Sequence, residues 1–336
     1  PICPDAVFVK RDFKWYETLS RQMLAIVQEV SPQVEFYSIA EQFFKAVEPT
    51  CSFAERLQDD VLRRVGVPVS IGIAPTKTLA KLISDSSKPF GCGIVSDDGE
   101  RIRLLRDTPV SEVTGIARRR AQHLADHGIH TCEEFANADR AFIRWLLTKS
   151  GEDLWWELNG TPVIPIQVKR PENKFIARGG SIGRASSDRN RIEAFIVRNV
   201  ERLVEALAYY KVACDQLTLS LLFTEFPERS VRSSLLGSRA DFEALLEAAL
   251  FLLPKTWQPP SASVHYMHVI AGKLRPIAQR QRSLFDESKL ADIKHNINNE
   301  VGRFALRSAA TLPLVDVYGD CANNYDICDI YGKSCF

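Results

Sequence analysis

Apolar residues in the first hundred positions recur at helical and extended spacings in turn. Six of them lie three or four apart and predict a helix that ends before Pro32. They are Trp15, Leu19, Met23, Ile26, Val27 and Val30. Residues 34–47 are rich in Phe, Tyr and Val and predict a hairpin of two short strands around residues 38–41.

The next segments carry helix-capping signals. Ser52 with Glu55 predicts a capping box for a helix that Gly66 closes. Residues 69–74 predict a buried strand, which leads into a helix opened by Pro75-Thr76. Glycines punctuate short helical segments from about residue 109 and predict a small all-helical domain, and the prolines of residues 162–171 predict a linker.

The second half has a regular order of elements. A continuous apolar helical face covers residues 192–207, with Asn190 and Glu193 as a capping box. Strands at 217–223, 229–235 and 261–271 and a helix at 242–253 indicate a split βαβ sandwich with one sheet face free for a ligand. After Pro276 the periodicity fades, which predicts a polar tail.

Composition narrows the class of protein. A chain of 336 residues with 45% hydrophobic and 25% charged content predicts a multidomain globular protein. No apolar run of membrane length and no signal sequence appear in it, which argues against membrane and secreted classes. Eight cysteines without a C-x-x-C pair favour reduced thiols and a cytoplasmic location. The net charge of +1 does not indicate nucleic acid, so only local basic clusters can.

The first such cluster follows the strand at residues 69–74. A strand that ends at a helix N-terminus, with Lys77 and Lys81 one turn apart, suits a phosphate group. The spacing alone also fits a solvated lysine face on an ordinary helix, and taken by itself it favours that interpretation. The segment continues through Asp85 to Lys88-Pro89.

Two long strings here resemble the Y-family, UmuC/DinB-type translesion DNA polymerases. They are S-P-Q-V-E-F-Y-S-I at 31–39 and I-G-I-A-P-T-K-T-L-A-K-L at 71–82 with S-D-S-S-K-P after them. The resemblance implies an α+β polymerase-like fold with a partial palm (1–107), a helical, helix-hairpin-helix-like thumb (108–168), a split βαβ little finger (169–275) and a C-terminal tail (276–336). It also implies that Lys77, Lys81 and Lys88 bind the triphosphate of a dNTP.

One departure from the family concerns the metal site. The family's S-I-D-E and an earlier Asp hold two Mg²⁺ ions, whereas this chain has Ala40 before Glu41. The earlier Asp would precede Pro1, so Glu41 is expected as the remaining catalytic and metal-binding carboxylate, with Glu48 as an alternative ligand. Loss of such groups predicts impaired catalysis. The chain is then either a fragment or a degenerate copy.

Arginines form two further clusters. Gly115, Arg118 and Arg119 resemble the family's thumb hairpin, which binds a DNA phosphate, although Ala117 replaces a second glycine and the spacing also suits a solvated helix start. In the little finger, Arg178, Arg184 and Arg232 are expected to contact the DNA backbone without sequence choice; scattered solubility charges are the alternative.

The tail carries a peptide that resembles the sliding-clamp motif of bacterial polymerases. Gln281, Leu284 and Phe285 would fill the clamp's pocket. Cys321, Cys328 and Cys335 are seven residues apart and match no common zinc spacing. The expected partners are primer-template DNA, dNTP, the sliding clamp and a UmuD-like accessory subunit, with no membrane. The prediction is a damage-tolerance polymerase homologue, with a noncatalytic DNA-binding adaptor as the alternative.

Overall fold

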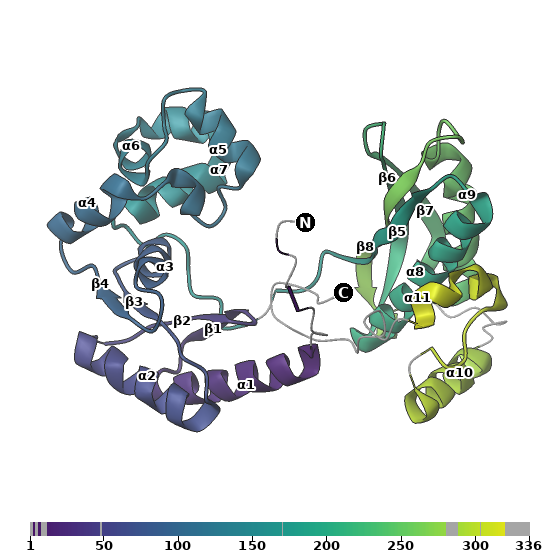
Figure 1. Cartoon of the computed structure of the whole chain (residues 1–336), viewed down its shortest axis with the longest axis horizontal. Helices are drawn as coiled ribbons and strands as arrows, with labels where there is room; N and C mark the ends of the chain where they lie inside the picture. Colours follow the sequence, from purple (N-terminus) through teal and green to yellow (C-terminus); the bar gives the residue numbers. More distant parts are fainter. Residues whose placement is uncertain are drawn as a thin grey trace. The chain divides into compact units, whose positions relative to one another are not determined.

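The computed structural model describes residues 3, 6–7, 12–47, 49–169, 171–279, 288–302 and 304–319. Contacts divide them into two compact units, the N-terminal unit (residues 14–169) and the C-terminal unit (171–319). Figure 1 shows helices and strands mixed in both units, so the predicted α+β, multidomain class is confirmed.

The first part of the N-terminal unit alternates helices with short strands. Its elements are α1 (Phe13–Val30), β1 (Val34–Ser38), β2 (Glu41–Phe44), α2 (Cys51–Val65), β3 (Ile71–Ile73), α3 (Lys77–Ser86), β4 (Cys92–Ile94) and α4 (Asp98–Asp107). β1 and β2 form the expected antiparallel hairpin, and β3 pairs with β4 in parallel. The predicted first helix and hairpin are therefore confirmed.

Two local predictions in this part are wrong. Helix α2 is capped by Thr50, whose hydroxyl accepts from the Phe53 amide, because the chain is already helical at Ser52. The strand predicted to be buried is only half-buried at Ile71–Ile73, and its partner β4 was not predicted. Three consecutive residues are too few to reveal a strand by periodicity.

The second part of the N-terminal unit is the expected small helical assembly. It contains η1 (Val110–Glu112), α5 (Arg118–Ala125), α6 (Cys132–Asn137) and α7 (Arg140–Leu158). Their buried residues, among them Phe135, Ile143 and Leu158, form one core that also includes Leu79 and Leu82 of α3. Helix α3 is thus packed against the helical assembly, which fixes the lysines that α3 carries.

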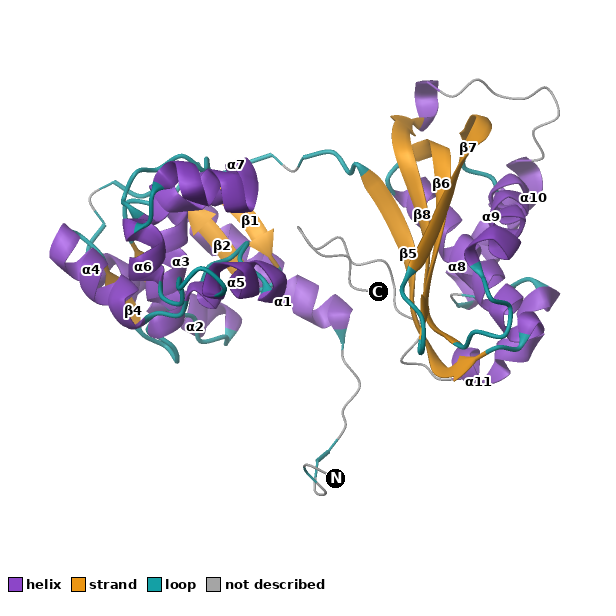
Figure 2. Ribbon diagram, turned by 90° about the horizontal axis from the view of Figure 1, so that it is seen from above, coloured by secondary structure: helices purple, strands orange, loops and turns teal. Residues whose placement is uncertain are grey.

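The C-terminal unit is a four-stranded antiparallel sheet covered by two helices. It contains β5 (Phe175–Ser186), α8 (Arg189–Tyr209), β6 (Val212–Phe223), β7 (Arg229–Arg239), α9 (Phe242–Thr256) and β8 (Val264–Pro276). The strands lie in the order β5-β8-β6-β7, and α8 and α9 cover one face (Figure 2). This is the expected order of strands and helices, although Asp188, not Asn190, caps α8.

The polar tail expected after Pro276 is wrong for residues 288–319. A short η2 (Ile277–Gln279) follows β8, and α10 (Ser288–Val301), η3 (Ala309–Leu314) and α11 (Val315–Gly319) come later. Phe304, Leu314 and Tyr318 join the core of the C-terminal unit. The carboxylate of Glu201 in α8 accepts from Lys294 Nζ at 2.6 Å and from the Ser308 amide at 2.9 Å. Such scattered apolar anchors around a polar contact leave no periodic signal. No helix in the described residues is both long enough and apolar enough to cross a bilayer.

Candidate functional site

The hairpin β1/β2 and helix α3 border a cavity of about 1560 Å³ within the N-terminal unit. Glu41, Lys81, Asp85 and Lys88 line it, together with apolar side chains of α1 and α2. A concave site that combines apolar walls with a few polar groups is typical of ligand binding.

Tight packing positions α3 beside β3. Thr76 caps α3 through its hydroxyl, which accepts from the Leu79 amide at 3.2 Å. A Cβ on Gly72 would lie 2.0 Å from the Ala80 carbonyl oxygen, so only glycine lets the strand approach the helix this closely. The lysines of α3 are therefore presented from a rigid element.

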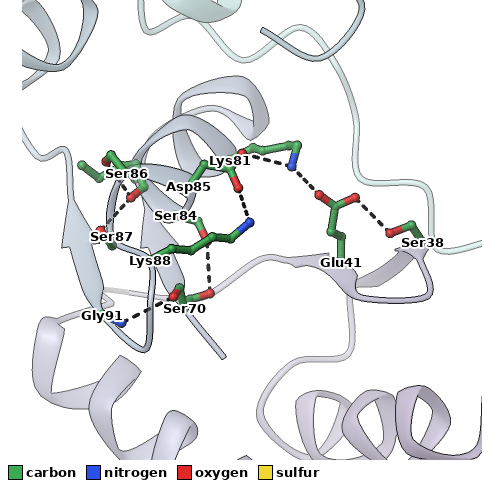
Figure 3. A network of polar contacts seen from close by, with 11 residues as sticks. Ser38, Glu41, Ser70, Lys81, Ser84, Asp85, Ser86, Ser87, Lys88 and Gly91 are labelled. Carbon is green, nitrogen blue, oxygen red and sulfur yellow. Dashed lines mark hydrogen bonds and ion pairs between the residues drawn. The ribbon is translucent and has the colours of Figure 1, made fainter. Parts of the chain in front are cut away.

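Lys81 is the centre of a polar network at this site (Figure 3). Its ammonium forms ion pairs with Glu41 of β2 and, at 3.2 Å, with Asp85 one turn later on α3. Ser38 donates to the second oxygen of Glu41 at 2.9 Å, and Lys88 Nζ lies 2.6 Å from Asp85. Two lysines and two carboxylates thus alternate, and their formal charges cancel.

The network keeps its members charged. Burial alone would raise the pKa of Glu41, but hydrogen bonds from Lys81 and Ser38 outweigh it and hold that pKa below its ordinary value. The pKa of Asp85 is lowered in the same way, because Lys88 and Lys81 outweigh the effect of burial. Burial would lower the pKa of Lys81, yet its bonds to Glu41 and Asp85 leave that pKa raised.

Lys77 lines the cavity too, and it has a carboxylate partner of its own. Its ammonium lies 2.6 Å from Glu35, with side-chain exposures of 14% for Lys77 and 4% for Glu35. The same carboxylate oxygen accepts from the Gln167 amide at 2.7 Å, and the ammonium lies 4.8 Å from the centre of the Phe43 ring. Lys77 therefore joins β1, α3 and the segment near residue 167, and it lines the same cavity as Lys81.

The described residues do not fit the two-metal site that the resemblance implies. Ala40 has no side-chain oxygen, and Glu41 is already paired with Lys81 and Ser38. Among the residues that the structure describes, no three His, Cys, Asp or Glu side chains are placed to hold a metal ion. Glu48 lies outside them.

In the helical assembly, the predicted DNA contacts lie together at one turn. Gly115 has a φ of 103°, which favours glycine, and it precedes α5 by three residues. Arg118 and Arg119 are exposed in the first turn of α5. The N-cap, Ala117, makes no side-chain cap bond to the amides of that turn. An anion can accept from such amides.

In the C-terminal unit, strand register separates the three predicted arginines. Arg232 is exposed and pairs with Thr218, which alternates with the buried Leu217 and Leu219, so Arg232 lies on the face away from the helices. Arg184 is also exposed, on β5. Arg178 differs from expectation: it pairs with the core residue Val269 and is 2% exposed, on the helix-covered side.

The other predicted sites fall outside the described residues. These are Gln281, Leu284 and Phe285, and the cysteines 321, 328 and 335. Conversely, the structure adds Ser38, Glu35 and Asp85 to the candidate site. The spacing of Lys81 and Asp85, four residues apart in a predicted helix, was an available signal for their ion pair. No local pattern links Glu35 to Lys77, 42 residues later.

Comparison with known proteins places two long segments of the chain in one family. Residues 1–85 match the impB/mucB/samB family, and residues 173–284 match the impB/mucB/samB family C-terminal domain. The fold is similar to the Y-family DNA polymerase chimera Dbh-Dpo4(243-245)-Dbh, with a TM-score of 0.65, 19% identity, and coverage of 81% of this chain and 79% of that one.

Two curated relatives extend over most of the chain. Protein ImpB of Salmonella typhimurium is 29% identical over 298 residues, which cover 82% of this chain and 69% of ImpB. DNA polymerase IV 1 of Bacillus subtilis is 27% identical over 329 residues, covering 92% of this chain and 78% of the relative. The chain therefore belongs to the impB/mucB/samB family, that of the Y-family, UmuC/DinB-type DNA polymerases.

Proposed function

We propose that this protein is a translesion DNA polymerase homologue that holds primer-template DNA at damaged positions and whose own catalysis is impaired. Family membership supports the polymerase class. The observation that carries the DNA-binding part is the pair of exposed basic surfaces, at the first turn of α5 and on the open sheet face of the C-terminal unit.

The surface on α5 suits one DNA phosphate. Uncapped amides of the first turn can donate to its oxygens, while Arg118 and Arg119 attract it through charge. Gly115 allows the tight turn before α5, because its φ of 103° would be strained for any residue with a side chain. Such contacts read no base, so this surface binds DNA of any sequence.

The open sheet face suits the backbone of a duplex. Arg232 projects from it, and Arg184 lies exposed on β5 at the opposite end of the strand order. Arg178 has no part in this proposal, because it lies on the helix-covered side. The phosphate contacts make binding strongly dependent on salt.

The cavity beside α3 differs from the two DNA surfaces, because its positive charges are paired with carboxylates. Lys81 and Lys88 are available to the triphosphate of a dNTP only in competition with Glu41 and Asp85. Ala40 removes an oxygen ligand at the tip of the hairpin. These features favour the second candidate, a noncatalytic DNA-binding adaptor that links damage-tolerance factors to the sliding clamp in the cytoplasm.

Primer extension tests the loss of catalysis on which both candidates rest. With Mg²⁺ and dNTPs on a lesion-bearing template, we expect incorporation at least about 10²-fold slower than by DNA polymerase IV 1 of Bacillus subtilis, because preorganised electrostatic groups are incomplete. Binding of the same primer-template should persist, as measured by fluorescence anisotropy. Robust incorporation that Glu41→Gln abolishes would exclude the adaptor and the impaired catalysis, and absence of binding at low salt would overturn the whole proposal.

We also propose that the C-terminal segment recruits the sliding clamp, and that a UmuD-like subunit is an accessory partner. Replacing Leu284 and Phe285 by Ala should abolish capture of the protein by an immobilised bacterial clamp, because two apolar side chains no longer fill its pocket. DNA binding should be unchanged. As a control, Leu306→Ala with Leu312→Ala changes two exposed leucines elsewhere and should leave capture intact. Equal capture by all three proteins would refute this docking.

A further inference from the structure

The environment of Lys81 distinguishes it from Lys88, the other lysine of the polar network. Its side chain is 19% exposed, compared with 62% for Lys88. Glu41, from the hairpin, and Asp85, from α3, both contact the one ammonium group, and Figure 3 shows it between the two carboxylates. A single positive charge therefore bridges carboxylates that are 44 residues apart in the sequence, at positions 41 and 85.

We infer that Lys81 is the resident cation of this site: its ammonium occupies the position between Glu41 and Asp85 that a divalent metal ion would need. The site is then complete as an ion cluster without a metal. It has no carboxylate from residue 40, and it does not take up Mn²⁺ or Mg²⁺ at the concentrations at which a built carboxylate site does.

The coordination chemistry makes the two occupants exclusive. Mg²⁺ requires oxygen ligands at about 2.0–2.1 Å in near-octahedral geometry. The Glu41 and Asp85 oxygens that would supply them contact Lys81 Nζ, at 3.2 Å for Asp85. A divalent ion would have to displace the ammonium, which would remain close to it on the rigid helix α3. The repulsion of like charges at a few ångströms opposes this exchange.

The neighbouring groups do not relieve that competition. Lys88 adds a second positive charge beside Asp85. The Ser38 hydroxyl donates a hydrogen bond to the other carboxylate oxygen of Glu41. An absent metal ion would account for the impaired catalysis, so the biological meaning of this inference rests on the proposed function. The test of the inference needs neither DNA nor nucleotide, so a failure of the inference is distinguishable from a failure of the proposed function.

The test is Mn²⁺ binding to the full chain, measured from the free-ion signal in electron paramagnetic resonance. Lys81→Met removes the ammonium and leaves both carboxylates in place. We expect it to bind one Mn²⁺ at least about tenfold more tightly than the unmodified protein, because a positive charge at contact distance is gone. Lys81→Arg retains the charge and should bind as the unmodified protein does.

Two further variants locate the effect. Adding Glu41→Ala to Lys81→Met should remove the gained ion. Lys149→Met is the matched control, since Lys149 also contacts two carboxylates, those of Glu152 and Asp153, but is 65% exposed on α7. A similar gain in this control would overturn the inference by showing that any released carboxylate suffices.

Two other outcomes would overturn it as well. One is tight, stoichiometric Mn²⁺ binding by the unmodified protein that Glu41→Ala abolishes. The other is a Lys81→Met protein with an unchanged circular dichroism spectrum and no gain in Mn²⁺ affinity. If Lys81→Met does not fold, Lys81→Gln, which keeps a polar side chain of similar length, takes its place with the same expected gain.

Discussion

Replacing Glu35 by glutamine is expected to lower the free energy of unfolding of the N-terminal unit by about 3 kcal/mol, because it leaves the ammonium of Lys77 buried without its counter-charge. Glu35 is 4% exposed and Lys77 14% exposed, so little water can replace the lost partner. The other acceptor recorded for Lys77 is the Pro165 carbonyl oxygen, at 3.5 Å.

The measurement is urea unfolding followed by tryptophan fluorescence. Four of the five tryptophans, Trp15, Trp145, Trp155 and Trp156, lie in this unit and report its transition. An effect below about 1 kcal/mol would mean that the pair is not buried in solution as it is in the structure.

The chain supplies a matched control in Glu29→Gln. Glu29 binds Arg64 through two hydrogen bonds of 2.6 and 2.7 Å, which resemble the Lys77 contact in length. That pair is exposed, at 42% for Arg64 and 55% for Glu29, so its loss should leave the free energy of unfolding nearly unchanged. The double variant Glu35→Leu with Lys77→Met should be more stable than Glu35→Gln, because it leaves no buried charge.

Loss of the exposed arginines is expected to weaken DNA binding, and to do so in a salt-dependent way. Arg118→Ala with Arg119→Ala should reduce the affinity for primer-template about tenfold, and Arg184→Ala with Arg232→Ala should do the same. The fall of log K with log salt concentration should become less steep, by about one for the Arg118/Arg119 pair, which shares one phosphate, and by about two for the Arg184/Arg232 pair. Fluorescence anisotropy between low and moderate salt measures both quantities.

Two other arginines test whether net charge alone explains the effect. Arg21 and Arg63 are paired with Glu17 and Asp60 on α1 and α2, two helices that carry neither of the proposed DNA surfaces. Arg21→Ala with Arg63→Ala removes the same charge, and the salt slope should stay as it is in the unmodified protein. A slope that falls equally in this variant would argue against the two defined surfaces. A slope unchanged in all three would argue against phosphate contacts by these arginines.

Sequence pattern anticipated the elements that carry a long periodic signal. The apolar faces of α1, α8 and α9 and the alternation in β6 each span enough residues to show their period. The family strings placed α3 correctly at the end of a strand. The short β4 and the helices after residue 288 escaped, because they are held by contacts with distant segments and not by a regular face of their own.

The candidate site was likewise predictable from the sequence only in part. Local sequence established that basic side chains lie at the start of α3, at the start of α5 and along the strands of a sheet, because helix and strand periods are properties of neighbouring residues. Which of these charges faces a ligand was decided by tertiary structure. Lys77 and Lys81 are equivalent by spacing, yet Glu35 buries one and the Glu41–Asp85 pair holds the other. Arg178 and Arg232 likewise differ only in the face that strand register assigns to them, since burial and pairing depend on residues far away in the chain.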